Sequence, residues 1–189
     1  MSLLWDFIIT LLIIWPPYVA NATPVVASKV FRRKTPIDLG RNFIDGRRLF
    51  GDGKTYEGFI TGLITGFVIG ELTYIIVTRA VNIVSELPNP LAVFVMCIAA
   101  LLGDLLGAFI KRRFGLPRGA PAPLLDQLDF LLAALLALWL IQPSVLRVIY
   151  VVIAVIITPP IHLATNAIAY LLGLRESHGD YVINFINSS

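Results

Sequence analysis

The stretch GDLLGAFIKRRFG, residues 103–115, places a carboxylate and three consecutive cations at the end of a long apolar run. The run reaches back to about residue 91, a length that lets a helix cross the roughly 30 Å hydrocarbon core of a bilayer. A charge inside such a segment is costly and is usually paired or functional, whereas cations are common at its ends. The stretch therefore predicts a membrane-spanning helix with a functional carboxylate, Asp104, near a basic boundary.

The composition of the whole chain agrees with a membrane location. The 189 residues are 57% hydrophobic and only 14% charged, and the mean hydropathy is +0.82. Soluble domains are about 45–50% apolar and about 25% charged, so the composition excludes an ordinary soluble enzyme. The lone cysteine, Cys97, excludes a disulfide framework and a thiolate metal site. We expect one membrane domain over residues 1–189, with no nucleic-acid partner and an oligomer as an open possibility.

Five apolar runs are long enough to span a bilayer, which predicts an all-α integral membrane protein built as a bundle of five transmembrane helices. The predicted spans are 3–28, 57–79, 91–110, 124–142 and 145–173. The first span lacks a basic leader and a cleavage site, so we interpret it as retained. Proline pairs at 16–17 and 159–160 should kink or break the outer two spans. Polar residues near these pairs, such as His162 and Asn166, should face the bundle interior.

The basic residues predict the orientation of the bundle. Eight of the 15 lysines and arginines fall within residues 29–56, and four more fall within 111–118. The positive-inside rule therefore places two functional loops, 29–56 and 111–123, in the cytoplasm of a multi-pass cell-membrane protein. With five spans, the N-terminus is then outside and the C-terminus inside.

Small residues predict two bare helix faces. The second span carries a glycine every four residues, at Gly58, Gly62, Gly66 and Gly70. Such a strip is typical of close helix packing, although a lipid tail could also lie in it. The third span has a second bare face, which we call the small-residue lane: Asp104, Gly107, Ala108 and Lys111. We expect the lane to be open for phosphate and metal, with the carboxylate at its deep end.

Carboxylates and cations gather where the third and fourth spans meet the cytoplasm. Asp104, Asp126 and Asp129 offer hard oxygen ligands of the kind that suit Mg²⁺, which often bridges to phosphates. The candidate groups for phosphate are Lys111, Arg112, Arg113, Arg118 and Gly107, with Arg47, Arg48 and Lys54 as contributions from a lid formed by the first loop. The pattern predicts a site for a nucleoside triphosphate, with the active site facing the cytoplasm. Two alternatives stay open: the cations could only enforce topology or bind anionic lipid, and Asp126 and Asp129 could only stabilise a helix N-terminus.

The motif GDGKT, residues 51–55, is not a Walker phosphate loop. That pattern requires a glycine at position 48, where this chain has Arg48. No strand is predicted before the motif either. The glycine-rich segment is better explained as part of the cytoplasmic lid.

The segment GDLLGAFIKRRFGLPRGAPAPLLDQLDF, residues 103–130, resembles the signature region of phosphatidate cytidylyltransferases. The chain is more closely similar to their archaeal counterparts, the CDP-archaeol synthases, and that similarity covers most of its length. It includes KTPIDLGRNFIDGRRLFGDGKTYEG at 34–58 and PPIHLATNAIAYLLGL at 159–174. The general signature has a serine where this chain has Ala108 and an arginine where it has Gln127, and its His-Gly-Gly is absent.

The resemblance implies a reaction. CTP and a phosphorylated isoprenoid diether glycerol lipid would give CDP-archaeol and pyrophosphate, with Mg²⁺ as the cofactor and the bilayer as the environment. The resemblance also implies that Asp104 and Asp126 bind metal and that Asp129 is a ligand or a neighbour of one. The catalytic candidates are Asp104, Asp126, Asp129 and Lys111.

Two other functions fit parts of the sequence. A CDP-alcohol phosphotransferase would have Asp-Gly-x-x-Ala-Arg where this chain has DGRRLF at 45–50, so Leu49 and Phe50 argue against it. A small transporter could use Glu71, His162 and Asn166 along a pathway. The concentration of acidic residues at one membrane face argues against that function.

Overall fold

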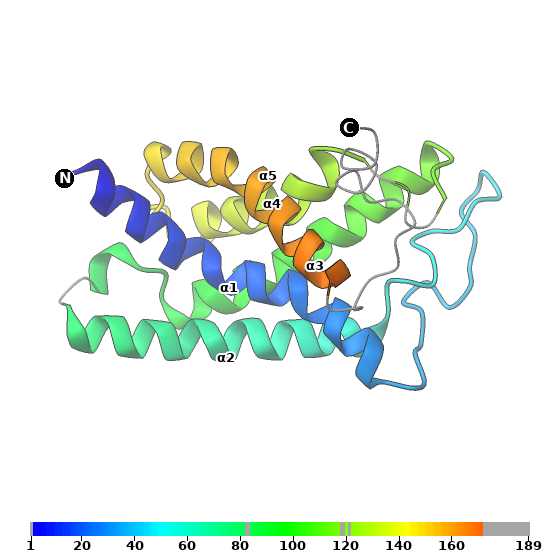
Figure 1. Cartoon of the computed structure of the whole chain (residues 1–189), viewed down its shortest axis with the longest axis horizontal. Coiled ribbons are helices and arrows are strands. Elements are labelled where there is room, and N and C mark those ends of the chain that lie inside the picture. The colour runs from blue at the N-terminus through cyan, green and yellow to red at the C-terminus, as the bar shows by residue number, and fades with distance from the viewer. Residues whose placement is uncertain (1, 82–83, 118–119, 121, 172–189) are drawn as a thin grey trace.

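The computed structural model describes residues 2–81, 84–117, 120 and 122–171, which form an all-helical bundle (Figure 1). The elements are α1 (Leu3–Val30), α2 (Tyr56–Ala80), the short 3₁₀ helix η1 (Val84–Glu86), α3 (Pro90–Arg113), α4 (Leu125–Ile141) and α5 (Val148–Leu171). A helix thus forms at each predicted span. Four of them, α1, α2, α3 and α5, are long and apolar enough to cross a membrane.

Helix starts follow from side chains that cap free backbone amides. Ser2, Thr55 and Asn89 each accept a hydrogen bond from an amide in the first turn of α1, α2 and α3, respectively. Pro90 occupies the first position of α3, where its missing amide hydrogen costs nothing. Helix α3 continues to Arg113, so Lys111, Arg112 and Arg113 form its last turn. The sequence pattern had predicted that the helix ends at residue 110 and that these three residues begin a loop.

The glycine strip of α2 is a packing surface for α1, as its spacing predicted. All four strip glycines are buried. A Cβ atom on Gly62 would lie 2.5 Å from the carbonyl oxygen of Ala20, and one on Gly66 would lie 2.6 Å from the Cβ of Ala20. Because α1 fills the strip, it leaves no groove for a lipid tail. Figure 1 shows the second half of α1 lying along α2, while its first half diverges from α2.

The apolar core lies among α1, α3, α4 and α5. Its fully buried side chains include Ile9, Ile13, Met96, Phe130 and Tyr150. Helices α3 and α4 approach each other closely, because a Cβ atom on Gly103 would lie 2.5 Å from the carbonyl oxygen of Asp129. This close approach fixes the position of α4 relative to Asp104, one residue further along α3.

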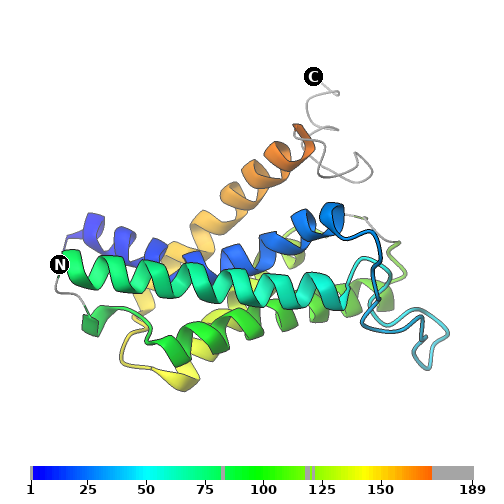
Figure 2. The same cartoon turned by 90° about the horizontal axis from the view of Figure 1, so that it is seen from below.

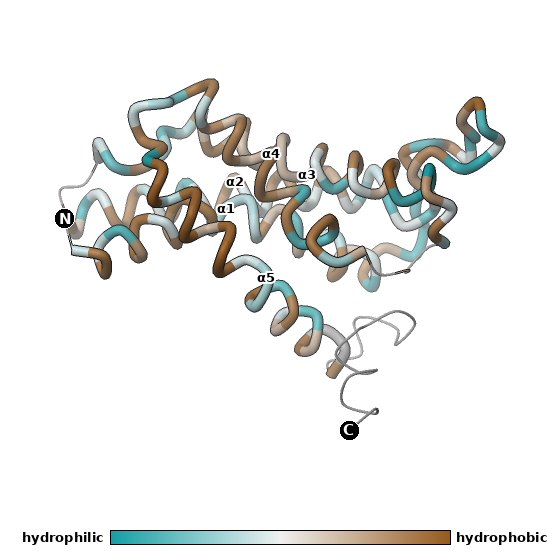
Figure 3. Tube along the Cα trace, turned by 90° about the horizontal axis from the view of Figure 1, so that it is seen from above, coloured by the Kyte–Doolittle hydropathy of each residue, from teal (hydrophilic) through white to brown (hydrophobic). Residues whose placement is uncertain are grey.

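The proline pairs do not break their helices. Helix α1 continues through Pro16 and Pro17, and α5 through Pro159 and Pro160, so the predicted break is absent. Figures 2 and 3 show α5 leaving the other four helices at an angle. The hydroxyl of Tyr18 donates to Oγ1 of Thr158 at 2.6 Å and ties α1 to α5 at the depth of the prolines.

The polar residues of α5 do not all face the interior. Thr158 is fully buried, as predicted. His162 is only half-buried, and its Nδ1 lies 3.2 Å from Nδ2 of Asn166. Thr165 is exposed, so the polar residues of α5 lie on different sides of the helix.

The two ends of the bundle differ in their chemistry. At the end with the N-terminus, the buried Asp6 pairs with Arg147 at 2.7 Å. At the opposite end, the loop 31–55 lies beside the end of α3 and the residues that follow it (Figure 1). Figure 3 shows hydrophobic residues along the helices and many hydrophilic ones at this loop-bearing end. The two basic segments thus share one end of the bundle, as their charge predicted.

Candidate active site

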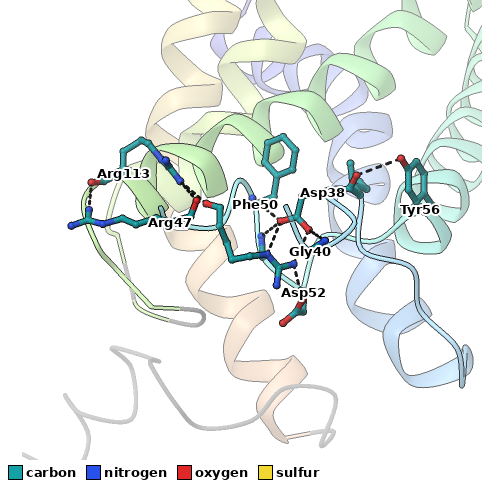
Figure 4. Close-up of polar contacts among 10 residues, drawn as sticks. Asp38, Gly40, Arg47, Phe50, Asp52, Tyr56 and Arg113 are labelled. Carbon is teal, nitrogen blue, oxygen red and sulfur yellow. Dashed lines mark hydrogen bonds and ion pairs between the residues drawn. The ribbon is translucent and has the colours of Figure 1, made fainter. Parts of the chain in front are cut away.

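Asp38 organises the loop 31–55. Its carboxylate accepts hydrogen bonds from the backbone amides of Gly40, Phe50 and Gly51 and from two nitrogens of Arg48 (Figure 4). The side chain has no exposed surface. Burial alone would raise its pKa, but the Arg48 guanidinium and the three amides hold the pKa of this carboxyl well below its usual range. Asp38 is therefore a buried carboxylate around which the loop folds, and its contacts favour the charged form.

The folded loop delivers Lys54 to the end of α3. The amide of Ile37 donates to the Lys54 carbonyl at 2.8 Å, and the amide of Tyr56 donates to the Thr35 carbonyl at 3.0 Å. These bonds fix the backbone at the lysine carbonyl and just after it, and the Lys54 amide donates to the Gly51 carbonyl at 3.2 Å on the other side. Nζ of Lys54 then lies 2.5 Å from Oδ2 of Asp104.

A second lysine–aspartate pair joins α3 to α4. Nζ of Lys111 lies 2.6 Å from Oδ1 of Asp126, and Oδ2 of Asp126 accepts from the amide of Ala122 at 3.0 Å. The side chains of Asp104 and Asp126 are 27% and 28% exposed, so both pairs are open to solvent at one edge. The predicted residues Asp104, Lys111, Asp126 and Lys54 are thus paired two by two at one end of the bundle.

Asp129 fills the space that the small-residue lane was predicted to leave open. A Cβ atom on Gly107 would overlap the Asp129 carboxylate. That prediction is wrong at Gly107, because the missing side chain makes room for α4 rather than for a ligand. Ala108 is buried as well, at 3% exposure. The charges of Asp104, Lys54 and Asp126 all act on Asp129, so the three carboxylates belong to one electrostatic cluster.

Arg113 holds the loop rather than presenting a free phosphate-binding group. Its guanidinium donates to the carbonyl oxygen of Arg47 (Figure 4), to the carbonyl oxygen of Arg48 and to the Asp45 carboxylate. The guanidinium also lies over two aromatic rings, 4.9 Å from the centroid of Phe43 and 4.8 Å from that of Phe109. Hydrogen bonds and ring stacking therefore fix Arg113 as a clamp between α3 and the loop.

The other candidate arginines are also engaged. Arg47 donates to the Arg113 carbonyl at 2.5 Å. Arg48 pairs with Asp38 and Asp52, which raise the pKa of its guanidinium. Arg112 donates to the carbonyl of Leu116. The predicted lid is therefore a loop anchored to the end of α3, and Arg118 lies outside the described residues.

The donor chemistry of the site fits magnesium through two carboxylates. Among the residues that the structure describes, no three His, Cys, Asp or Glu side chains converge closely enough to hold a metal ion. Mg²⁺ at phosphate-transfer sites is usually held by one or two carboxylates, with water and substrate phosphates completing the shell. Asp104 and Asp126 are partly exposed and carry oxygen donors of the kind that Mg²⁺ prefers.

Sequence reasoning missed Asp38 and Asp45. Both lie in the loop 31–55, and each accepts from an arginine. The available signal was local: an aspartate two residues before a glycine often bonds the amide of that glycine, as Asp38 does with Gly40. That signal predicts a turn. It does not show that Arg48, Phe50 and Gly51 also donate hydrogen bonds to the same carboxylate.

Comparison with known proteins identifies the family and agrees with the fold. The family described as CarS-like, CDP-archaeol synthase, matches residues 2–178. A CDP-archaeol synthase from Pyrobaculum aerophilum is 52% identical over 90% of this chain and 98% of its own length. One from Methanocaldococcus jannaschii is 42% identical over 86% of this chain and 92% of its own.

A solved structure gives the same result in three dimensions. It is described as an intramembrane enzyme for archaeal membrane lipids biosynthesis, and it matches with a TM-score of 0.63 and 37% sequence identity. The match covers 83% of this chain and 92% of that one. The chain belongs to the CarS-like family of CDP-archaeol synthases.

Proposed function

We propose that this protein is a CTP-dependent cytidylyltransferase that converts a phosphorylated isoprenoid diether glycerol lipid to CDP-archaeol, with release of pyrophosphate. The observation that carries the proposal is the pair of lysine–aspartate contacts, Lys54 with Asp104 and Lys111 with Asp126, at one end of an apolar bundle. Lysine and aspartate are residue types that bind phosphate and Mg²⁺, and their meeting at the loop-bearing end of an apolar bundle supports the proposal.

The reaction requires little covalent chemistry from the protein. An anionic oxygen of the lipid phosphate attacks the α-phosphorus of CTP, and the bond from that phosphorus to the oxygen bridging to the β-phosphate breaks. The electron pair leaves with pyrophosphate, so no serine or cysteine nucleophile is required. Lys54 and Lys111 donate hydrogen bonds to the triphosphate and offset charge that develops on the leaving group. Each lysine exchanges its aspartate for phosphate when CTP binds.

Asp104 and Asp126 are the proposed magnesium ligands, with Asp129 supporting them electrostatically. When bound, the ion neutralises phosphate charge and makes the α-phosphorus easier to attack. Gly107 serves the site by admitting Asp129 close to α3. Arg47, Arg48 and Arg113 hold the loop that carries Lys54, and Arg112 and Arg118 are candidates for nucleotide contacts.

The isoprenoid chains need an apolar surface within the bundle. An apolar groove of about 350 Å³ lies between α1, α2 and α5, and Leu11, Trp15, Tyr18, Thr73 and Ile161 line it. Figure 2 shows α5 at an outward angle to α1 and α2, the helices that also line this groove. We assign one chain of the lipid substrate to it, in place of the glycine strip.

The proposal places the loop-bearing end in the cytoplasm, with the N-terminus outside. It also requires α4 to cross the membrane, in addition to α1, α2, α3 and α5. The 17 residues of α4 give a length of only about 26 Å. The rule that basic loops stay inside supports this orientation. The loop 31–55 and the end of α3, which carry most of the basic residues, share one end of the bundle.

Single-cysteine labelling tests the orientation. In a Cys97→Ala background, Ser144→Cys should react with a membrane-impermeant maleimide in intact cells, whereas Ile44→Cys should react only after permeabilisation. Both residues are exposed, Ile44 at 94%, so reactivity reports the side of the membrane. Labelling of Ile44→Cys in intact cells would reverse the orientation. Labelling of both positions from the same side would mean that α4 does not cross.

A direct assay tests the reaction. Purified protein is incubated with radiolabelled CTP, Mg²⁺ and a phosphorylated digeranylgeranyl glycerol diether, and the lipid extract is analysed for label. We expect a labelled CDP-lipid and an equal amount of pyrophosphate, both absent when EDTA replaces Mg²⁺. Product formation that persists in EDTA would exclude the magnesium assignment. Consumption of a supplied CDP-lipid instead of its formation would favour a phosphotransferase.

A further inference from the structure

We propose that Asp38 is a positioning residue for cytidylyl transfer, which acts by holding Lys54 at the active site. Asp38 is not part of the apolar core, and none of its hydrogen bonds involves a proposed metal ligand. The inference rests on the proposed role of Lys54 as a phosphate donor, and it adds a residue outside the cluster of lysines and aspartates.

The hydrogen bonds of Asp38 leave it no free capacity for a ligand. Its Oδ1 accepts from the amide of Gly40 at 3.1 Å and from Nη2 of Arg48 at 2.7 Å. Its Oδ2 accepts from the amides of Phe50 and Gly51 at 3.1 and 2.9 Å and from Nε of Arg48 at 3.2 Å. A carboxylate offers about four acceptor positions, and all of them are in use here. Asp38 therefore acts on the loop and not directly on metal or nucleotide.

Two backbone bonds connect this centre to Lys54. The amide of Lys54 donates to the carbonyl of Gly51 at 3.2 Å, and Gly51 itself donates to Asp38. The carbonyl of Lys54 accepts from the amide of Ile37, the residue just before Asp38, at 2.8 Å. Both peptide groups that flank the Cα atom of Lys54 are thus bonded to immediate neighbours of one buried carboxylate.

Fixing the backbone matters for lysine because its side chain is long and flexible. A lysine loses about 2 kcal/mol of rotamer entropy when it is held in one geometry. A defined Cα position limits the conformations that its Nζ must search to reach Asp104 or a phosphate. Without Asp38, Arg48 loses its buried partner, the amides of Phe50 and Gly51 lose their acceptor, and the segment that carries Lys54 becomes loose.

The test is a double-mutant cycle with a matched control. Asp38→Ala, Lys54→Met and the double variant are compared by kcat/KM for CTP, with lipid saturating. Asp52→Ala is the control, because Asp52 pairs with the same Arg48 from an exposed position, with 63% of its side chain exposed. We expect Asp38→Ala to lower kcat/KM by about 10-fold or more in the wild-type background and by less than about 2-fold in the Lys54→Met background. Asp52→Ala should change it by less than about 2-fold.

Hydrogen exchange provides a readout that does not depend on activity. In Asp38→Ala, the amides of Gly40, Phe50 and Gly51 should lose protection, while those of α1–α4 keep theirs. Asp38→Asn retains one oxygen acceptor and should recover part of the lost kcat/KM. Loop amides that stay protected in Asp38→Ala would overturn the proposal.

The kinetic outcomes separate the two roles. If Asp38→Ala and Lys54→Met are each costly and their effects multiply, Asp38 does not act through Lys54, and only the present inference fails. If Lys54→Met leaves kcat/KM unchanged, the phosphate-binding role of Lys54 fails, and the positioning role of Asp38 fails with it.

Discussion

Asp104→Asn is expected to lower the rate of CDP-lipid formation by about 100-fold or more, the range seen when one electrostatic group that stabilises a transition state is removed. The substitution keeps the shape of the side chain but removes its negative charge. It takes away a proposed magnesium ligand and, with it, the partner that holds Lys54 Nζ at 2.5 Å. Asp126→Asn should have an effect of similar size, because it disrupts the equivalent pair with Lys111.

Stability should change little in these variants. Asp104 is partly exposed at the loop-bearing end, and it lies outside the apolar core. The melting temperature in detergent should therefore stay within a few degrees of wild type, which separates lost chemistry from lost folding. Asp52→Asn provides the control, since it removes an exposed carboxylate from the same end of the molecule. A turnover rate for Asp104→Asn within about threefold of wild type would exclude the carboxylate from the chemistry.

Gly62→Leu is expected to separate α2 from α1 and to prevent recovery of a stable bundle. Even a Cβ atom at this position would lie 2.5 Å from the carbonyl oxygen of Ala20, and a backbone atom cannot move aside as a side chain can. Gly62→Ala should therefore already cost about 2–3 kcal/mol, near the upper end of the range for overpacked sites, and leucine should cost more.

The matched control is Gly58→Ala on the same face of α2. There a Cβ atom would lie 3.1 Å from Oγ1 of Thr55 and 3.2 Å from Cβ of Pro24, so small shifts relieve the contact. We expect a cost below about 1 kcal/mol. Cys97 is fully buried, so a thiol-reactive dye reports unfolding as temperature rises. Equal melting temperatures for Gly58→Ala and Gly62→Ala would show that α1 does not pack on the strip as described.

Most of the fold was predictable from local patterns. Hydropathy and length placed the helices, because the cost of an unpaired backbone in hydrocarbon leaves few other structures. The four-residue spacing of glycines predicted the α1–α2 contact, because it creates a bare face whatever the partner helix is. The proline pairs did not break their helices, since neighbouring helices can support a helix that runs through proline.

The candidate site was predictable in its chemistry but not in its pairing. The sequence alone identified Asp104, Asp126, Asp129 and Lys111 as neighbouring groups at one end of the bundle, because charges at the end of an apolar span are conspicuous. It also identified the basic character of the loop 31–55. It could not show which of these cations remain available, because lysines and arginines compete for the same carboxylates and only their positions in space decide that competition.

The sequence by itself thus determined the all-helical membrane architecture, the shared end of the two basic segments and the residue types of the site. These properties depend on hydrophobicity, helix periodicity and charge, each of which acts over a few neighbouring residues. Only the tertiary structure decided that Lys54 reaches Asp104 across 50 positions of sequence, that Asp129 fills the notch at Gly107, and that Arg48 and Arg113 hold the loop. Such contacts depend on how close the helices approach and on how the loop closes, and neither is encoded in any single segment.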